Sequence, residues 1–135
     1  MKQIAVIIIG FIAGLAISGV LGDLIVVVSN SVGRISSAWS VSQAEREIAG
    51  GNFLQAQKHY EKALQKIDPQ NKKLLAKTKN NYALAIYYDA AENNDAAQIE
   101  KSREIFKEAL MLYEELGDEA SAQEVEENIK TADAD

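Results

Sequence analysis

The sequence predicts an all-α protein in which a single N-terminal transmembrane helix precedes a small helical-repeat module of about five helices. Three observations support this fold class. The first 28 residues are almost wholly apolar, and apolar residues farther along recur at the three- and four-residue spacings of amphipathic helices. One proline and eight glycines in 135 residues leave few turn signals for an all-β fold.

The apolar run over residues 4–28 contains one charged residue, Asp23. About 20 apolar residues cross a bilayer core, and residues 4–22 alone provide 19. Residues 1–28 are therefore expected to form a transmembrane helix, with Asp23 at the far interface. A cleaved signal peptide, with Lys2 as its short positive n-region, is the alternative. The run continues beyond the candidate cleavage sites, which favours a retained anchor.

Small residues recur every four positions along this run. Positions four apart lie on one face of a helix, where small side chains let another helix backbone approach closely. This face is predicted to pack against another protein helix. Its members are Gly10, Gly14, Ser18 and Gly22.

The few charges near the span predict its orientation. Lys2 and the amino terminus precede the apolar run, whereas Asp23 and Arg34 follow it. The positive-inside bias places the N-terminus in the cytoplasm and the helical domain on the other side of the membrane. A single-pass membrane protein anchored by residues 4–28 is therefore expected.

The remaining chain divides into a juxtamembrane linker (29–36), a helical domain (37–131) and an acidic tail (132–135). Residues 36–135 hold 12 basic and 19 acidic side chains, a net charge of −7. Such a domain is a poor candidate for nucleic-acid binding, so no nucleic-acid partner is expected.

The charge is unevenly distributed along the domain. Residues 58–79 carry +5, whereas residues 89–135 carry −11. One interpretation is solvated helix faces. The other is a polar module whose basic end attracts an acidic partner, including the acidic end of a second copy.

Five apolar stripes with helical spacing follow one another in the domain. Asn52 is the expected N-cap of the second helix, Asp68-Pro69 its stop, and Gly117 the left-handed C-cap of the fourth. The stripes occupy residues 39–48, 53–66, 74–86, 99–113 and 119–130.

One of these helices carries a more specific pattern. A Gly-Asn-aromatic turn is followed by a small residue, an aromatic residue four positions later, an Ala-Leu pair and a proline. This pattern resembles the second half of a tetratricopeptide repeat. The residues are Gly51-Asn52-Phe53, Ala56, Tyr60, Ala63-Leu64 and Pro69.

Two later segments continue the resemblance over about residues 38–131. Asn81-Tyr82-Ala83 is similar to the first helix of a second repeat, and Ser102, Phe106 and Ala109-Leu110 repeat the spacing of the second helix. The distance from Ala56 to Ser102 is 46 residues, where about 34 is usual. The helices are therefore extended or the turn near 91–97 is long. An irregular helical bundle is the alternative fold.

The resemblance implies that the first helices of the repeats line a groove for an extended or helical peptide. Tyr87 and Tyr88 cannot both be buried on one stripe, so at least one should reach the groove or solvent. Asn81 matches one member of the carboxylate clamp that some family members use, but its expected partner positions hold Val41 and Glu45. The matching groove positions are Val41, Glu45, Ile48, Lys77, Asn80, Asn81, Leu84, Tyr87 and Tyr88.

No catalytic grouping can be assembled from the sequence. The chain has no cysteine and one histidine, His59, so neither a Cys-His pair nor a Ser-His-Asp set is expected, and no cofactor or metal is predicted. A non-enzymatic accessory or assembly subunit of a membrane protein complex is the expected function. The alternative is a structural subunit that self-assembles into homo-oligomers through its hydrophobic N-terminal helices.

Overall fold

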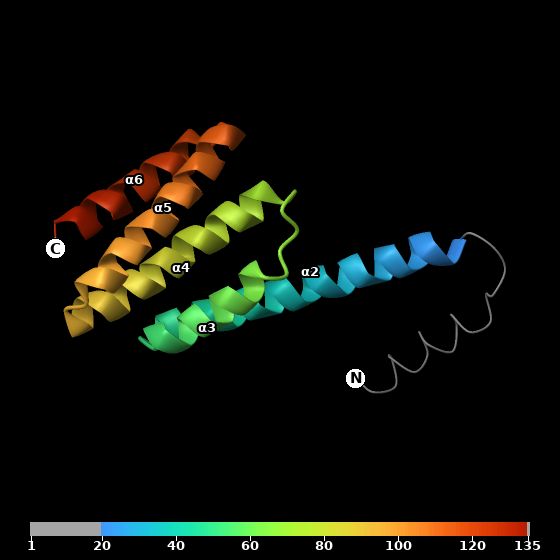
Figure 1. Ribbon diagram of the computed structural model, residues 1–135, viewed down its shortest axis with the longest axis horizontal. Coiled ribbons are helices and arrows are strands. Elements are labelled where there is room, and N and C mark those ends of the chain that lie inside the picture. Colours follow the sequence, from blue (N-terminus) through green and yellow to red (C-terminus); the bar gives the residue numbers. More distant parts are fainter. Residues whose placement is uncertain (1–19, 135) are drawn as a thin grey trace. The chain divides into compact units, whose positions relative to one another are not determined.

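The computed structural model describes residues 20–134, with side-chain surroundings given from residue 31 onward. Every regular element within this range is an α-helix, which confirms the all-α prediction (Figure 1). The helices are α2 (Val20–Ala49), α3 (Phe53–Leu64), α4 (Lys72–Asn93), α5 (Ala96–Leu116) and α6 (Glu119–Asp133).

Two compact units divide the chain at Gly33 and Arg34. We refer to residues 34–135 as the helical unit. The predicted linker over residues 29–36 lies within α2, which runs through this boundary without a break. None of the described helices is both long and apolar enough to cross a bilayer. Most of the predicted span, including Gly10, Gly14 and Ser18, lies outside the described residues, and Gly22 falls in the first turn of α2.

Polar side chains at three helix starts explain where the helices begin. The Asn71 side chain accepts a hydrogen bond from the Leu74 amide at 3.3 Å, and Asp95 accepts from two amides of α5 at 3.1 Å. Asp118 caps α6 through the Ser121 amide at 3.2 Å. Each bond satisfies an amide that has no partner within its own helix.

The N-cap predicted at Asn52 is correct in position, but the expected side-chain hydrogen bond is not formed. Asn52 occupies the position before α3, but its side chain makes no capping hydrogen bond. The amide nitrogen Nδ2 instead donates to Glu47 Oε2 at 3.0 Å. Gly51 has φ +74°, a left-handed conformation that favours glycine and lets the chain reverse between α2 and α3.

The long repeat spacing comes from long helices. Helices α4 and α5 contain 22 and 21 residues, and only Asn94 and Asp95 separate them. Asn94 adopts φ 54°, which ends α4 in a left-handed cap. The turn is therefore short, and the extended helices pack against each other in Figure 1. The last helix also continues to Asp133, past the predicted end at Lys130.

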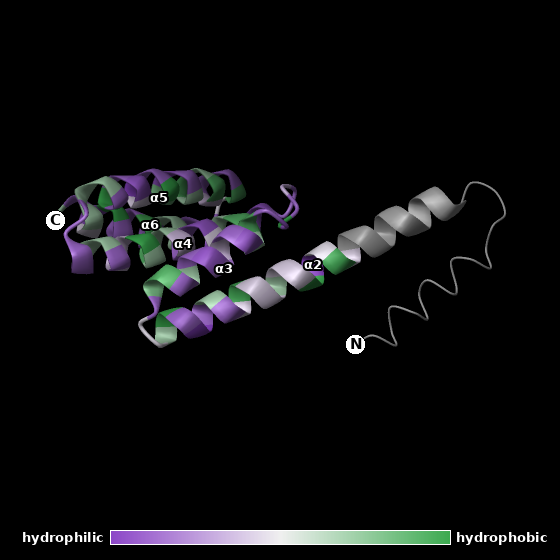
Figure 2. Cartoon of the chain, turned by 60° about the horizontal axis from the view of Figure 1, so that its bottom comes forward, coloured by the Kyte–Doolittle hydropathy of each residue, from purple (hydrophilic) through white to green (hydrophobic). Residues whose placement is uncertain are grey.

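Two hydrophobic clusters hold the helical unit together. The first joins the C-terminal part of α2 to α3 and α4, and its centre includes Ala44, Tyr60 and Ile86. The second joins α4, α5 and α6 around Phe106, Ala109 and Val125, all fully buried. In Figure 2, hydrophilic and hydrophobic residues alternate along α5, as expected for a helix with one face in the core.

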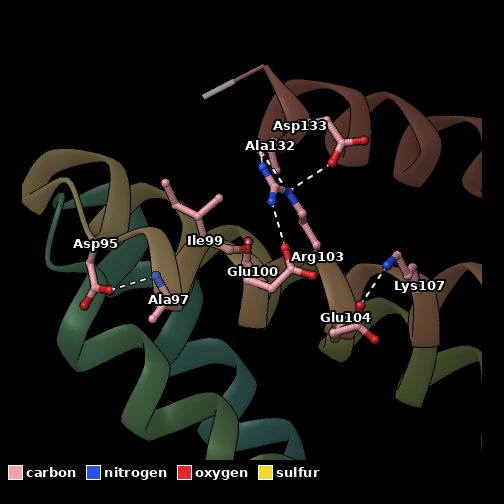
Figure 3. Close-up of polar contacts among 10 residues, drawn as sticks. Asp95, Ala97, Ile99, Glu100, Arg103, Glu104, Lys107, Ala132 and Asp133 are labelled. Carbon is pink, nitrogen blue, oxygen red and sulfur yellow. Dashed lines mark hydrogen bonds and ion pairs between the residues drawn. The ribbon is translucent and has the colours of Figure 1, made fainter.

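An arginine fastens the end of α6 to α5. Arg103 donates from Nε to the Ala132 carbonyl oxygen at 3.0 Å and from Nη1 to Glu100 at 2.7 Å (Figure 3). Its Nε also lies 3.0 Å from the Asp133 carboxylate. Ala132, assigned to the acidic tail from sequence, is fully buried in the second cluster. The fold of the unit therefore extends at least to Asp133.

The basic and acidic stretches of the sequence meet within the chain. Lys72 of α4 pairs with Glu115 of α5 at 2.7 Å, and Lys79 of α4 pairs with Glu108 of α5. Both ion pairs are at least partly exposed to solvent, so each contributes only about 0–1 kcal/mol. Basic residues of 58–79 thus pair with acidic residues of 89–135 within one chain, in the contact between α4 and α5.

Candidate binding groove

A polar cavity of about 260 Å³ lies where α4 meets the turn between α5 and α6. Cationic and anionic side chains both line it. This volume is below the roughly 300–1,000 Å³ of typical small-molecule sites, so it suits a few side chains of a longer ligand better than a whole cofactor. The lining residues are Lys73, Lys77, Asn80, Asn81, Tyr113, Asp118, Ser121 and Glu124.

Helical spacing explains how α4 supplies half of this lining. Lys73, Lys77 and Asn80 are separated by four and three residues, which places them on one face of α4. The opposite wall comes from the last turn of α5 and the first turns of α6. Gly117, with φ 66°, reverses the chain between those helices and brings Asp118 within 3.8 Å of the Lys73 amine.

Interhelical contacts fix the polar side chains around the cavity. Lys77 Nζ donates to Glu45 Oε1 of α2 at 3.3 Å. Asn80 is 4% exposed, and its Oδ1 accepts from Asn128 Nδ2 of α6 at 3.1 Å. Helix α4 is therefore held on both sides by groups that also face the cavity region.

Acidic neighbours influence the tyrosine in the cavity wall. Burial raises the pKa of Tyr113, and the carboxylates of Glu124 and Asp118 raise it further. A hydrogen bond with Ser121 partly opposes them. The α6 side of the cavity is thus the electronegative side, facing the amines of α4.

Tyr60 lies in the core of the helical unit with an unsatisfied hydroxyl. Its side chain is fully buried, and its Oη has no hydrogen bond of normal geometry. Burial, assisted by the negative charge of Glu45, raises the pKa of Tyr60 to about 12, although the nearby Asn81 side chain lowers it somewhat. The Tyr60 hydroxyl therefore lies within electrostatic range of Glu45, which forms an ion pair with Lys77.

The raised pKa predicts a loss of stability at high pH. The folded state favours neutral Tyr60, so its stabilisation is complete below the ordinary value of 10.0 and is lost as the pH rises toward about 12. Chemical denaturation across this range should show a smaller decline in unfolding free energy for Tyr60→Phe than for the wild type. Tyr88→Phe, at an exposed position, serves as the control and should follow the wild type. Identical declines in all three proteins would contradict the assignment.

The nine predicted groove residues occupy three kinds of environment. Lys77, Asn80 and Asn81 line the cavity, and Glu45 is exposed beside Lys77. The remaining five lie elsewhere. Val41 and Tyr87 are buried in the first and second clusters, Ile48 and Leu84 pack partly buried against them, and Tyr88 is 43% exposed.

The adjacent tyrosines separate as predicted. Tyr87 is buried, whereas Tyr88 reaches solvent and places its ring 5.2 Å from the Phe53 ring. Buried Val41 and Tyr87 cannot contact a ligand in the groove without a change in the fold. Lys73 and the α5–α6 wall of the cavity were not predicted from the sequence. The sequence feature that could have indicated this wall is the three-residue spacing of Asp118, Ser121 and Glu124 at the start of α6.

No metal centre is found within residues 20–134, because no three carboxylate or histidine side chains there come together as potential ligands. Comparisons of the chain with protein-family models, with curated proteins and with solved structures give no match in any of the three. The tetratricopeptide resemblance therefore rests on the residue pattern and stays a prediction.

Proposed function

We propose that the chain is a non-enzymatic, membrane-anchored interaction module of the tetratricopeptide kind. It acts as an accessory or assembly subunit of a membrane protein complex. The apolar N-terminal run anchors it, and the helical unit recruits a protein partner. The anchor and the repeat family are inferred from the residue pattern, and the cavity beside α4 supports the recruiting role.

The mixed charge of the cavity is the observation that carries this proposal. Two amines from α4 face carboxylates from α5–α6 across a space that side chains of a peptide can fill. A peptide with an acidic side chain near a basic or amide one would pair with both walls. Such paired polar contacts orient a ligand, while the small volume limits the site to part of it.

Partner capture with charge-reversed variants tests the proposal. The full chain in mild detergent is used as bait for membrane extracts, and captured proteins are compared by quantitative mass spectrometry. Lys73→Glu combined with Lys77→Glu should reduce capture of the specific partner at least tenfold, because both cationic groups of the cavity are reversed. Circular dichroism should show unchanged helix content, since these lysines are exposed.

A matched control changes the net charge equally at a distance from the cavity. Lys107 and Lys130 are exposed on α5 and α6 and are absent from the cavity lining. The variant Lys107→Glu with Lys130→Glu should retain the wild-type partner. Equal capture by the cavity variant and the wild type would contradict the proposed role of the groove.

A further inference from the structure

Two large apolar residues are exposed near the start of the helical unit. Ile35 and Trp39 are 71% and 62% exposed, whereas Ser37 and Ser40 on the same helix are buried at 1% and 3%. An amphipathic helix of a globular unit normally has the opposite arrangement. Both buried serine hydroxyls donate to carbonyl oxygens of α2 at 3.0 Å, so the inner face of the helix is complete without the apolar pair.

Contacts with α3 place this exposed pair beside basic side chains. The rings of Trp39 and His59 meet edge to face, with their centroids 6.5 Å apart. Lys66 Nζ, one turn and a half farther along, donates to Ser36 Oγ of α2 at 2.7 Å. Lysines spaced by four residues share one face of a helix. We call Lys58, Lys62 and Lys66 the lysine row; they lie on one face of α3 and of the turn that follows it.

The lysine row has no ion-pair partner within residues 31–134. Every ion pair in that range takes its basic group from α4 or α5. The carboxylates of residues 34–64 are already bonded to other groups. They are Glu45 with Lys77, Glu47 with Asn52 and Glu61 with Tyr82. The exposed apolar pair therefore lies beside positive charge that the described part of the chain does not neutralise.

The net charge of the helical unit is divided in the same sense. Residues 34–68 hold five basic and four acidic side chains, a net charge of +1. Residues 69–135 hold eight basic and fifteen acidic side chains, a net charge of −7. Near an anionic surface, this distribution favours the orientation in which α2 and α3 approach the surface and the acidic helices face away from it.

We propose that the surface formed by Ile35, Trp39 and the lysine row lies on the headgroups of an anionic lipid bilayer. Tryptophan is enriched at membrane–water interfaces, where its ring is partly apolar and its N–H can meet water or a headgroup. Clustered lysines near the bilayer are attracted to anionic lipids. The contact rests on the membrane association in the proposed function, and adds to it a defined orientation of the helical unit. It does not depend on the groove.

A protein partner fits this surface less well than lipid does. Lysine is depleted at protein–protein interfaces, because its strongly hydrated amine is costly to bury there. A second copy docked by the same surface would bring two lysine rows together, and like charges repel across an interface. Anionic headgroups instead supply the opposite charge and leave the amines in a hydrated layer.

Fluorescence in vesicles tests the proposal, because Trp39 is the only tryptophan of the chain. The full chain is reconstituted in vesicles of phosphatidylcholine, or of equal parts phosphatidylcholine and phosphatidylglycerol. Each kind contains lipid brominated near the headgroup, which quenches an indole ring that touches it. Quenching should be about threefold stronger in the anionic vesicles, where the lysine row is attracted to phosphatidylglycerol. High salt should remove the difference by screening.

Charge reversal in the lysine row should abolish the preference for anionic vesicles. Lys58→Glu combined with Lys62→Glu should lower quenching there to the level seen in phosphatidylcholine. Both lysines are exposed, so circular dichroism should show unchanged helix content. Lys107→Glu combined with Lys130→Glu is the matched control, since it changes the net charge equally on α5 and α6. This control should be quenched like the wild type.

Three results would overturn the proposed lipid contact. They are equal quenching in the two kinds of vesicle, wild-type quenching of the Lys58 and Lys62 variant, and short-wavelength Trp39 emission without quenching, which would assign the surface to a protein contact. Carbonate extraction reports the anchor separately. A chain that is extracted, yet quenched only in anionic vesicles, would refute the anchor and support the lipid contact. A chain that is retained without quenching would do the reverse.

Discussion

Phe106→Ala is expected to lower the unfolding free energy of the helical unit by about 3–5 kcal/mol, the usual cost of removing a buried phenylalanine. Phe106 is fully buried in the cluster that joins α4, α5 and α6. Its removal leaves a cavity that three long helices can fill only partly. Urea denaturation of residues 34–135, followed by circular dichroism, measures the change.

Met111→Ala provides the control for this measurement. Met111 lies on the same helix but is 55% exposed, so its truncation should change stability by less than about 1 kcal/mol. Similar losses for Phe106→Ala and Met111→Ala would mean that the second cluster does not form in solution.

Ala83→Leu is expected to cost about 1–3 kcal/mol through overpacking. Ala83 is fully buried in the second cluster, on the helix that packs along α5. Leucine adds three carbon atoms where alanine leaves no free surface, so α4 and α5 must move apart. Ala83 belongs to the segment Asn81-Tyr82-Ala83, which resembles the first helix of a second repeat, and it is fully buried.

Ala91→Leu is the matched control for the overpacking experiment. Ala91 is exposed near the end of the same helix. The substitution should change the urea midpoint little, because both residues favour helix and the added side chain meets solvent. An unchanged midpoint for Ala83→Leu as well would show that α4 and α5 are more loosely packed than the structure indicates.

The end of α5 followed from the sequence because one residue there carries its own conformational preference. Gly117 suited a left-handed end, and it has φ 66°. The cap at Asn52 failed because its Nδ2 donates to Glu47 Oε2, five residues earlier, and the side chain accepts no hydrogen bond from the first amides of α3. Such a choice depends on whether the side-chain rotamer presents its oxygen to the helix amides or its NH₂ group to a nearby acceptor, and residue spacing does not contain that information.

The residues of the candidate groove likewise divide into those that the sequence indicated and those that it did not. Lys77, Asn80 and Asn81 of the α4 wall were among the groove positions that the tetratricopeptide resemblance implied, whereas Lys73 was not. The opposite wall was missed because it depends on how α6 is rotated after the turn at Gly117, which a single-helix periodicity cannot give. Leu84 and Tyr87 were placed in the groove by resemblance, yet Leu84 packs partly buried against the second cluster and Tyr87 lies within it.

The order in which the helices contact one another affects how the chain folds during its synthesis. The most extensive contacts join α3 to α4, α4 to α5 and α5 to α6, each pair consecutive in sequence. Contacts between segments that are close in sequence have a small entropic cost of loop closure, and they form quickly. During synthesis from the N-terminus, α5 and α6 leave the ribosome with their main partners, α4 and α5, already present, whereas α3 and α4 gain theirs when the next helix emerges. The helical unit can therefore assemble one helix at a time behind its N-terminal segment, without waiting for the last residue.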